Sequence, residues 1–157
     1  MTFQIEGFRE LERALVNELP KATARNAMRR AATESMEPMR ERMSQLAPFD
    51  PDDRDGNGQH LRDTMRTQTA TARVAREIGT SRDAGVVVLT GPAPVGKRAR
   101  ANAGWQEYGT VKMGAKSYAR VAADTEAPVV FARIKDALAK EIEKAKKRIA
   151  RKAAKGG

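Results

Sequence analysis

The chain has 157 residues, which is enough for one domain with a modest core and too few to suggest two. Cysteine is absent and there is a single histidine, so a disulfide framework, a cysteine nucleophile and a multi-histidine metal site are excluded. The formal net charge is +10, and only 4% of the residues are aromatic, so we expect a thin core that is completed against partners.

The first half of the chain is predicted to be mostly helical. Residues 2–6 alternate apolar and polar side chains, as in a short strand. Apolar residues then follow helical spacing over 8–19, and residues 22–46 predict a long helix rich in alanine and methionine. Pro38 lies inside that helix and predicts a kink, because it lacks a backbone N–H. A polar loop over 48–60 follows.

The middle of the chain is predicted to form a small sheet. A short helical turn is expected at 60–66, followed by strands over 67–78 and 86–90 that pair as a hairpin around a turn at 79–85. Residues 92–104, rich in glycine, proline and arginine, are interpreted as a mobile loop.

A last helix is predicted from about 125 to 152, with Pro128 in its first turn and Asp124 or Thr125 as its cap. Its apolar face comprises Phe131, Ile134, Leu138, Ile142, Ala145 and Ile149. The expected fold class is α+β, with two long helices, N-terminal and C-terminal, packed against a small antiparallel sheet. We expect a single domain whose core covers about 2–47, 61–91 and 103–150, with loops at 48–60 and 92–104 and a basic end at 144–157.

Positive charge is concentrated in that basic end, where residues 144–155 hold seven cations and no acid. Two interpretations stay open: a solvated helix end whose cations suit the helix dipole, or a surface for a polyanion or an acidic partner. The candidate contact residues are Lys97, Arg98 and Arg100 in the predicted loop, and Lys144, Lys147, Arg148, Arg151 and Lys152 at the helix end.

The stretch GVVVLTGPAPVGKR, residues 85–98, is close to the phosphate-binding loop G-x-x-x-x-G-K-[ST]. In that loop, backbone N–H groups wrap the phosphates and a serine or threonine hydroxyl holds Mg²⁺. Here Arg98 occupies the hydroxyl position, and Pro92 and Pro94 remove two backbone donors. The residues that follow also lack the apolar period of the required helix. We therefore expect no nucleotide site, no cofactor and no enzymatic activity.

Residues 53–64 match part of a calcium-binding loop. The matching positions are Asp53, Asp55, Asn57 and Gly58. Thr64 stands where a bidentate glutamate belongs, and Asp63 lies one position out of register. A solvated turn is the favoured interpretation and calcium binding the alternative, so no metal site is assigned. His60 has no catalytic partners in the sequence, and a loop or cap role is expected for it.

Short motifs in a fixed order cover almost the whole chain. They are F-x-I-x-G-F at 3–8, Leu61, Arg62 and Met65 within a stretch similar to G-x-L-R-x-S-I, Gly91-Pro92 at a strand end, E-Y-G-T at 107–110 (similar to E-F-G-T), and SYARVA at 117–122 (similar to P-F-x-R-P-A). Together they resemble the tail-completion or neck proteins of long-tailed double-stranded-DNA phages, the family of lambdoid gene product ten. The chain departs from that pattern at Thr64, Ser117 and Val121, where serine, proline and proline are usual.

The resemblance implies a structural virion protein, not an enzyme, that is assembled in the host cytoplasm. Such proteins form a ring of six or twelve copies around the DNA channel at the head–tail junction, and the ring joins the head-completion ring to the tail terminator. Contact with double-stranded DNA in the channel is a further implied possibility.

The resemblance also suggests which residues fix the fold for assembly. These are Leu61, Arg62, Gly91, Glu107, Tyr108, Gly109, Thr110, Tyr118 and Arg120. The turn at 107–110 would fix the sheet against the helices, and Tyr118 and Arg120 would anchor the last helix. The alternative function is a small basic protein that binds nucleic acid without sequence preference, although the aromatic residues are few and scattered and there is no recognition-helix motif.

Overall fold

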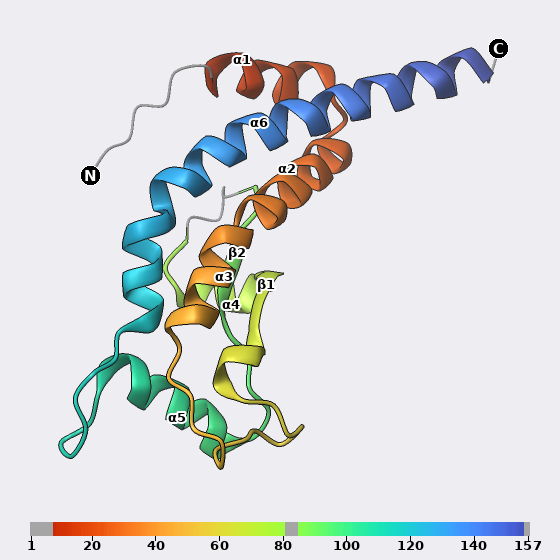
Figure 1. Ribbon diagram of the computed structural model, residues 1–157. Coiled ribbons are helices and arrows are strands. Elements are labelled where there is room, and N and C mark those ends of the chain that lie inside the picture. Colours follow the sequence, from red (N-terminus) through yellow and green to blue (C-terminus); the bar gives the residue numbers. More distant parts are fainter. Residues whose placement is uncertain (1–7, 81–84, 156–157) are drawn as a thin grey trace. The chain divides into compact units, whose positions relative to one another are not determined.

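The computed structural model describes residues 8–80 and 85–155, and these divide into two compact units (Figure 1). Of the described residues, the first unit comprises 8–35, 69–80, 85–88 and 131–155, and the second comprises 36–68 and 89–130. The strand expected at 2–6, the F-x-I-x-G-F motif apart from Phe8, and most of the turn expected at 79–85 lie outside the described residues. The single-domain organisation stays a prediction.

The helices of the first unit include most of the C-terminal helix. They are α1 (Phe8–Arg13), the π-helix η1 (Ala14–Glu18), α2 (Lys21–Ser35), α4 (Ala72–Glu77) and the part of α6 (Tyr118–Lys155) that follows residue 130. In α2 the buried residues are Ala24, Ala27, Ala31 and Ser35, whose small side chains permit close approach of the helices. The core is formed by Ala14, Leu19, Ala24, Ala31, Ala137, Leu138, Ile142 and Ala145.

Glu141 is a buried acid in this unit. Its carboxylate accepts hydrogen bonds from Arg30 Nε at 2.5 Å and from Lys144 Nζ at 2.9 Å. Burial raises the pKa of Glu141, but the hydrogen bonds from Lys144 and Arg30 lower it by more, so the net pKa lies below the ordinary value of 4.5. The charged form of Glu141 is therefore the form that the fold favours.

This depressed pKa predicts acid sensitivity of the first unit. The contribution of Glu141 is fully present above its unfolded pKa and is lost as the pH falls through the lower folded pKa. Below about pH 4.5, the free energy of unfolding should fall less steeply with decreasing pH in Glu141→Gln than in the wild type. Urea denaturation at a series of pH values measures this slope. Glu143→Gln, which removes an exposed carboxylate from the same helix, should retain the wild-type slope. An unchanged slope in Glu141→Gln would contradict this assignment.

The second unit holds three helical elements beside the first turns of α6. These are α3 (Glu37–Leu46), the 3-10 turn η2 (Leu61–Thr64) and α5 (Lys97–Tyr108). The buried core comprises Met43, Ala47, Met65, Tyr118 and Ala122. Leu61 packs against this cluster, and Tyr118 is its most buried large side chain, at 1% exposure. The helical turn expected at 60–66 is confirmed over 61–64, whereas Met65 and Arg66 belong to the first strand.

The sheet has two strands, β1 (Met65–Thr69) and β2 (Val88–Pro92). Ala93 N–H donates to the Thr64 carbonyl, Thr67 and Thr90 share a hydroxyl hydrogen bond, and Ala70 N–H donates to the Val87 carbonyl. The residue numbers of each pair have the same sum, which defines an antiparallel register. The mixed helical and antiparallel class is confirmed. The finer prediction of two long helices packed on the sheet is met only in part, because Met65 is the one strand residue in either described core.

Near the kink predicted at Pro38, the helix predicted over 22–46 is divided into two helices. α2 ends at Ser35, and α3 begins at Glu37 with Pro38 in its first turn. The buried Ser35 hydroxyl donates to the Ala31 carbonyl at 2.7 Å, which satisfies an acceptor at the end of α2. The break also falls at the boundary between the two units.

The predicted strand over 67–78 is wrong beyond Thr69. Thr71 caps α4, because its hydroxyl accepts a hydrogen bond from Val74 N–H, and an Arg73–Glu77 ion pair lies along the helix. Threonine suits both strands and helix caps, so its frequency here does not separate the two.

The predicted mobile loop at 92–104 is also wrong, because residues 97–104 belong to α5. The helix begins after Gly96 and is rich in alanine and arginine, which favour helices. Its inner face carries the small Ala103 and the carboxylate of Glu107 instead of large apolar residues. An apolar periodicity therefore could not reveal it.

The last helix begins seven residues earlier than the predicted start at 125. Asp124 and Thr125 lie inside α6 and do not cap it, and Pro128 is internal instead of in the first turn. The residue that caps α6 is Glu107, described below, which is remote in sequence. The predicted apolar face is confirmed at Leu138, Ile142 and Ala145, which are buried, whereas Phe131 and Ile149 are exposed. Within the described residues, none of the helices combines the length and apolar character needed to span a bilayer.

Candidate functional site

The loop between β2 and α5 does not form a phosphate cradle. Pro92 and Pro94 lack N–H groups. The residue that follows each of them, Ala93 or Val95, already donates its N–H within the protein. Ala93 N–H bonds the Thr64 carbonyl at 3.0 Å, and Val95 N–H bonds an Asp55 carboxylate oxygen at 2.9 Å. The Asp55 carboxylate thus holds a donor that a phosphate would need, and its negative charge opposes an anion there.

Asp55 also organises the turn that partly matches a calcium-binding loop. Its second carboxylate oxygen accepts from the N–H groups of Asn57 at 2.8 Å and Gln59 at 2.9 Å. The hydrogen bond from Val95 N–H contributes most to lowering the pKa of Asp55, followed by that from Gln59 N–H. Its oxygens are therefore directed at backbone donors instead of at a common point.

The other side chains considered as calcium ligands either form hydrogen bonds within the protein or are exposed. Asp53 accepts a hydrogen bond from the Asn102 side chain, and the buried Thr64 hydroxyl donates to the Leu61 carbonyl at 2.8 Å. Asp63 is exposed. Among the residues that the structure describes, no three side chains of histidine, aspartate or glutamate are grouped to hold a metal ion. The solvated turn accounts for this loop, and calcium binding gains no support from it.

His60 and Arg62 pack on Phe49. The ring centroids of Phe49 and His60 are 4.6 Å apart, and the Arg62 guanidinium carbon lies 3.9 Å from the Phe49 ring centroid. A ring nitrogen of His60 is 3.2 Å from the Asp53 carbonyl oxygen, and the Arg62 carbonyl accepts from the Ser44 hydroxyl at 2.8 Å. The cluster fastens the loop to α3, in keeping with the loop role expected for His60.

Two of the motif segments meet at Glu107, in what we call the Glu107 joint: Glu107, Gly109, Ser117, Tyr118 and Arg120. The Glu107 carboxylate is buried and accepts from Ala119 N–H at 2.8 Å and Arg120 N–H at 3.1 Å. Arg120 Nε lies 3.5 Å from the same carboxylate. The acid thus satisfies free donors in the first turn of α6 and its charge suits the helix dipole.

The remaining bonds of the Glu107 joint fix the turn between α5 and α6. The Tyr118 hydroxyl donates to the Ala103 carbonyl at 3.3 Å, and burial raises the pKa of Tyr118 to about 12. Gly109 has φ of 79°, and Ser117, at φ 49°, is a non-glycine residue in the left-handed region. Both Glu107 and Tyr118 are therefore structural, and neither presents a free group for chemistry.

Exposed apolar side chains occur on α5 and on the turn that follows it. Tyr108 is 76% exposed, and the Arg120 guanidinium carbon lies 5.8 Å from its ring centroid. Val111 is fully exposed in the turn, and Thr110 beside it bridges to Met113. Trp105 is half exposed on α5. In this turn Glu107 bonds the start of α6, whereas Tyr108 and Thr110 are exposed. That the turn at 107–110 fixes the sheet against the helices stays a prediction.

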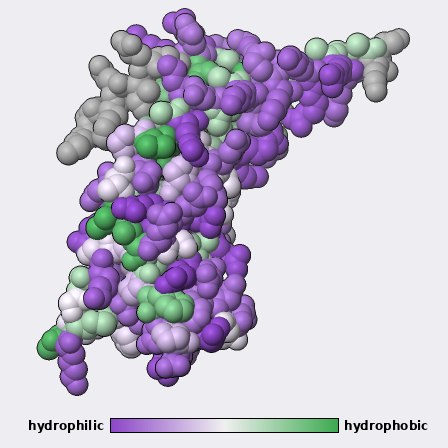
Figure 2. Space-filling view, in the orientation of Figure 1, coloured by the Kyte–Doolittle hydropathy of each residue, from purple (hydrophilic) through white to green (hydrophobic). Residues whose placement is uncertain are grey.

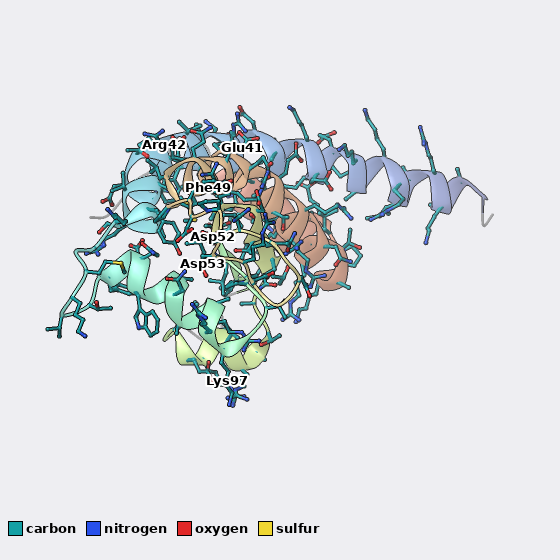
Figure 3. The ribbon with its side chains drawn as sticks, turned by 60° about the horizontal axis from the view of Figure 1, so that its bottom comes forward. Glu41, Arg42, Phe49, Asp52, Asp53 and Lys97 are labelled. Atoms are coloured by element: carbon teal, nitrogen blue, oxygen red, sulfur yellow. The ribbon has the colours of Figure 1, made fainter. Side chains whose placement is uncertain are left out.

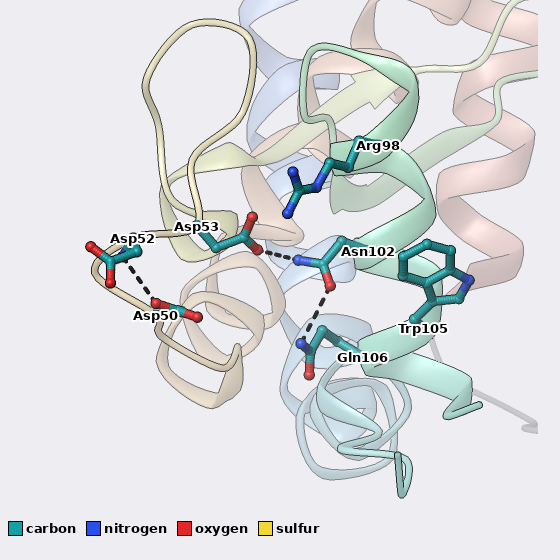
Figure 4. Close-up of a pocket in the computed structure, with 7 residues that line it drawn as sticks. All are labelled: Asp50, Asp52, Asp53, Arg98, Asn102, Trp105 and Gln106. Carbon is teal, nitrogen blue, oxygen red and sulfur yellow. Dashed lines mark hydrogen bonds between the residues drawn. The ribbon is translucent and has the colours of Figure 1, made fainter. Parts of the chain in front are cut away.

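A hollow of about 310 Å³ lies between the polar loop and α5 (Figure 4). It is lined by Asp50, Asp52, Asp53, Arg98, Asn102, Trp105 and Gln106. Asp53, Asn102 and Gln106 form a chain of hydrogen bonds along its wall, while Asp52 N–H bonds the Asp50 carboxylate (Figure 4). The hollow combines both charge signs with an exposed indole, as a polypeptide contact does.

The predicted basic residues fall into two groups in different units. Lys97, Arg98 and Arg100 are exposed on the first turn of α5, where Figure 3 shows Lys97 directed outward. Lys144, Lys147, Arg148, Arg151 and Lys152 are exposed on α6 in the first unit. Gly91 lies within β2, where a Cβ would have open space, so the structure gives it no special backbone role.

No protein-family model, curated protein or solved structure matches the chain. The Glu107 joint and the exposed apolar residues around it are therefore interpreted from their own chemistry. The sequence pointed to the joint through E-Y-G-T and SYAR, but it did not indicate the capping role of Glu107. The D-G-N-G setting of Asp55 is typical of an acid that bonds backbone N–H groups in a turn, and this signal indicates the role that the structure gives it.

Proposed function

We propose that this chain is a structural subunit of a phage head–tail junction, where copies of it form a ring around the DNA channel. The observation that carries the proposal is the exposure of Tyr108 and Val111 on a turn that the Glu107 joint holds in place. Aromatic side chains such as that of Tyr108 are enriched in surfaces that another protein covers. Neighbouring copies of the chain are the first partners that we infer.

The chemistry of the joint supports a structural role over an enzymatic one. The oxygens of Glu107 are occupied by two backbone N–H groups and Arg120, and the Tyr118 hydroxyl is buried against a carbonyl. A catalytic acid or base must reach a substrate, and these groups do not. The ring would also contact the head-completion ring and the tail terminator, with six or twelve copies.

The proposal predicts that Tyr108→Ser with Val111→Ser abolishes assembly while the subunit stays folded. Both side chains are exposed, so their loss should change the stability of the monomer by less than about 0.5 kcal/mol. Native mass spectrometry and electron microscopy of the chain, alone and with purified phage heads or tails, measure assembly. The matched control is Val16→Ser, which removes an equally exposed apolar side chain from the first unit.

A wild-type chain that remains a monomer and joins neither heads nor tails would overturn the proposed function. A ring that survives the double substitution but not Val16→Ser would place the interface in the first unit instead.

A further inference from the structure

The last turns of α6, residues 147–155, form a segment that we call the α6 tip. The last ion pair that ties α6 to the preceding helices joins Lys146 Nζ to a Glu18 carboxylate oxygen at 2.6 Å. Every residue from 147 to 154 is exposed. Within the first unit, the tip continues past α1, η1 and α2, with side chains standing out on several sides (Figures 1 and 3). It is therefore a helix end that no described neighbour covers.

The α6 tip is strongly basic and internally unpaired. Lys147, Arg148, Arg151 and Lys152 form no ion pair with any residue that the structure describes, and the tip contains no acid. At about 100° per residue, these four side chains fall within roughly 140° of the helix circumference. Figure 2 shows hydrophilic residues gathered along this part of α6. Like charges four residues apart, as in Lys147 and Arg151, repel one another and weaken the helix.

We propose that the α6 tip binds the phosphate backbone of duplex DNA without sequence preference. Duplex DNA carries one negative charge per about 1.7 Å of its axis, so a short cationic helix meets several phosphates at once. The four unpaired cations supply the affinity by displacing counterions, and no base contact is required. Only the place where the tip meets DNA, the channel of the head–tail junction, rests on the proposed function.

Other polyanions fit the α6 tip less well. It contains no aromatic side chain, so it offers no stacking platform for unpaired bases. Ile149 is its only large apolar residue, so it lacks the apolar face with which a helix enters a lipid surface. An acidic protein would have to place its carboxylates to match the four cations, whereas duplex phosphates are continuous along both strands.

The inference is tested by fluorescence anisotropy with a mixed-sequence DNA duplex of about 30 base pairs, titrated at several salt concentrations. Four phosphate contacts predict a slope of log affinity against log salt of about −3.6. We expect the variant Lys147→Gln, Arg148→Gln, Arg151→Gln and Lys152→Gln to lose at least tenfold in affinity at about 50 mM salt and most of that slope. Circular dichroism should show more helix when DNA joins the wild type, because phosphates relieve the repulsion along the tip.

The matched control neutralises four other exposed cations of the first unit. Arg9→Gln, Arg13→Gln, Lys21→Gln and Arg25→Gln change the net charge equally and should retain most of the affinity and the gain in helix. Equal losses in the control and the tip variant would show that total charge, not the tip, binds DNA. Tighter binding of a single-stranded oligonucleotide, duplex RNA or poly-glutamate than of duplex DNA would likewise overturn the inference.

The outcome is separable from that of the proposed function. A chain that assembles into rings but whose tip does not bind duplex DNA would overturn this inference alone. A chain that binds duplex DNA through the tip but never joins heads or tails would overturn the proposed function and leave the inference standing.

Discussion

Glu107→Ala is expected to lower the free energy of unfolding by about 2–3 kcal/mol, measured by urea denaturation. The substitution removes a buried carboxylate that accepts from Ala119 N–H and Arg120 N–H, so two donors in the first turn of α6 lose their partners. It also removes the negative charge that faces the start of the helix dipole and the Arg120 side chain. Near Tyr118, hydrogen exchange of the first α6 amides should rise for the same reason.

The matched control is Asp124→Ala, an exposed acid farther along the same helix. If α6 began near residue 125, Asp124 would be a cap and its loss would be costly. Because α6 begins at Tyr118, Asp124 is an interior helical residue, and alanine there should be neutral or slightly stabilising. A large loss in Asp124→Ala together with a negligible loss in Glu107→Ala would contradict the capping role of Glu107.

Gly109→Ala is expected to destabilise the second unit by about 3 kcal/mol or more, measured as a fall in urea midpoint. A Cβ on Gly109 would lie 2.9 Å from the backbone N of Ala115 and 2.9 Å from the backbone O of Met113. Its φ of 79° and ψ of 179° are also open only to glycine. Both contacts involve backbone atoms, so relief requires the turn itself to move.

The matched control is Gly104→Ala in the same segment. Gly104 lies inside α5, and a Cβ there meets no atom within 4 Å. Alanine is the better helix former, so this substitution should stabilise by about 0.5–1 kcal/mol. Opposite signs for the two glycines are the expected result. If Gly109→Ala were as well tolerated as Gly104→Ala, the turn would not have the conformation described.

The site was predictable only as far as local patterns reach. The order of E-Y-G-T and SYAR drew attention to Glu107, Gly109 and Tyr118, and all three lie in the Glu107 joint. The pattern did not predict that Glu107 caps a helix that begins eleven residues later, because capping signals are recognised only among neighbouring residues. The sequence also did not predict that Tyr108 and Val111 are exposed, because apolar residues are usually expected to be buried.

The sequence by itself determined the end of the Pro38-containing helix, the buried middle of the C-terminal helix and the concentration of positive charge at the C-terminal end. These follow from proline chemistry, periodic apolar residues and charge counting, which act over a few residues. The tertiary structure was needed to establish α5, the start of α6 and the hydrogen bonds that Asp55 makes in the loop between β2 and α5. There the deciding groups, Glu107 and Asp55, satisfy backbone donors in distant segments, and a contact between remote residues leaves no local pattern.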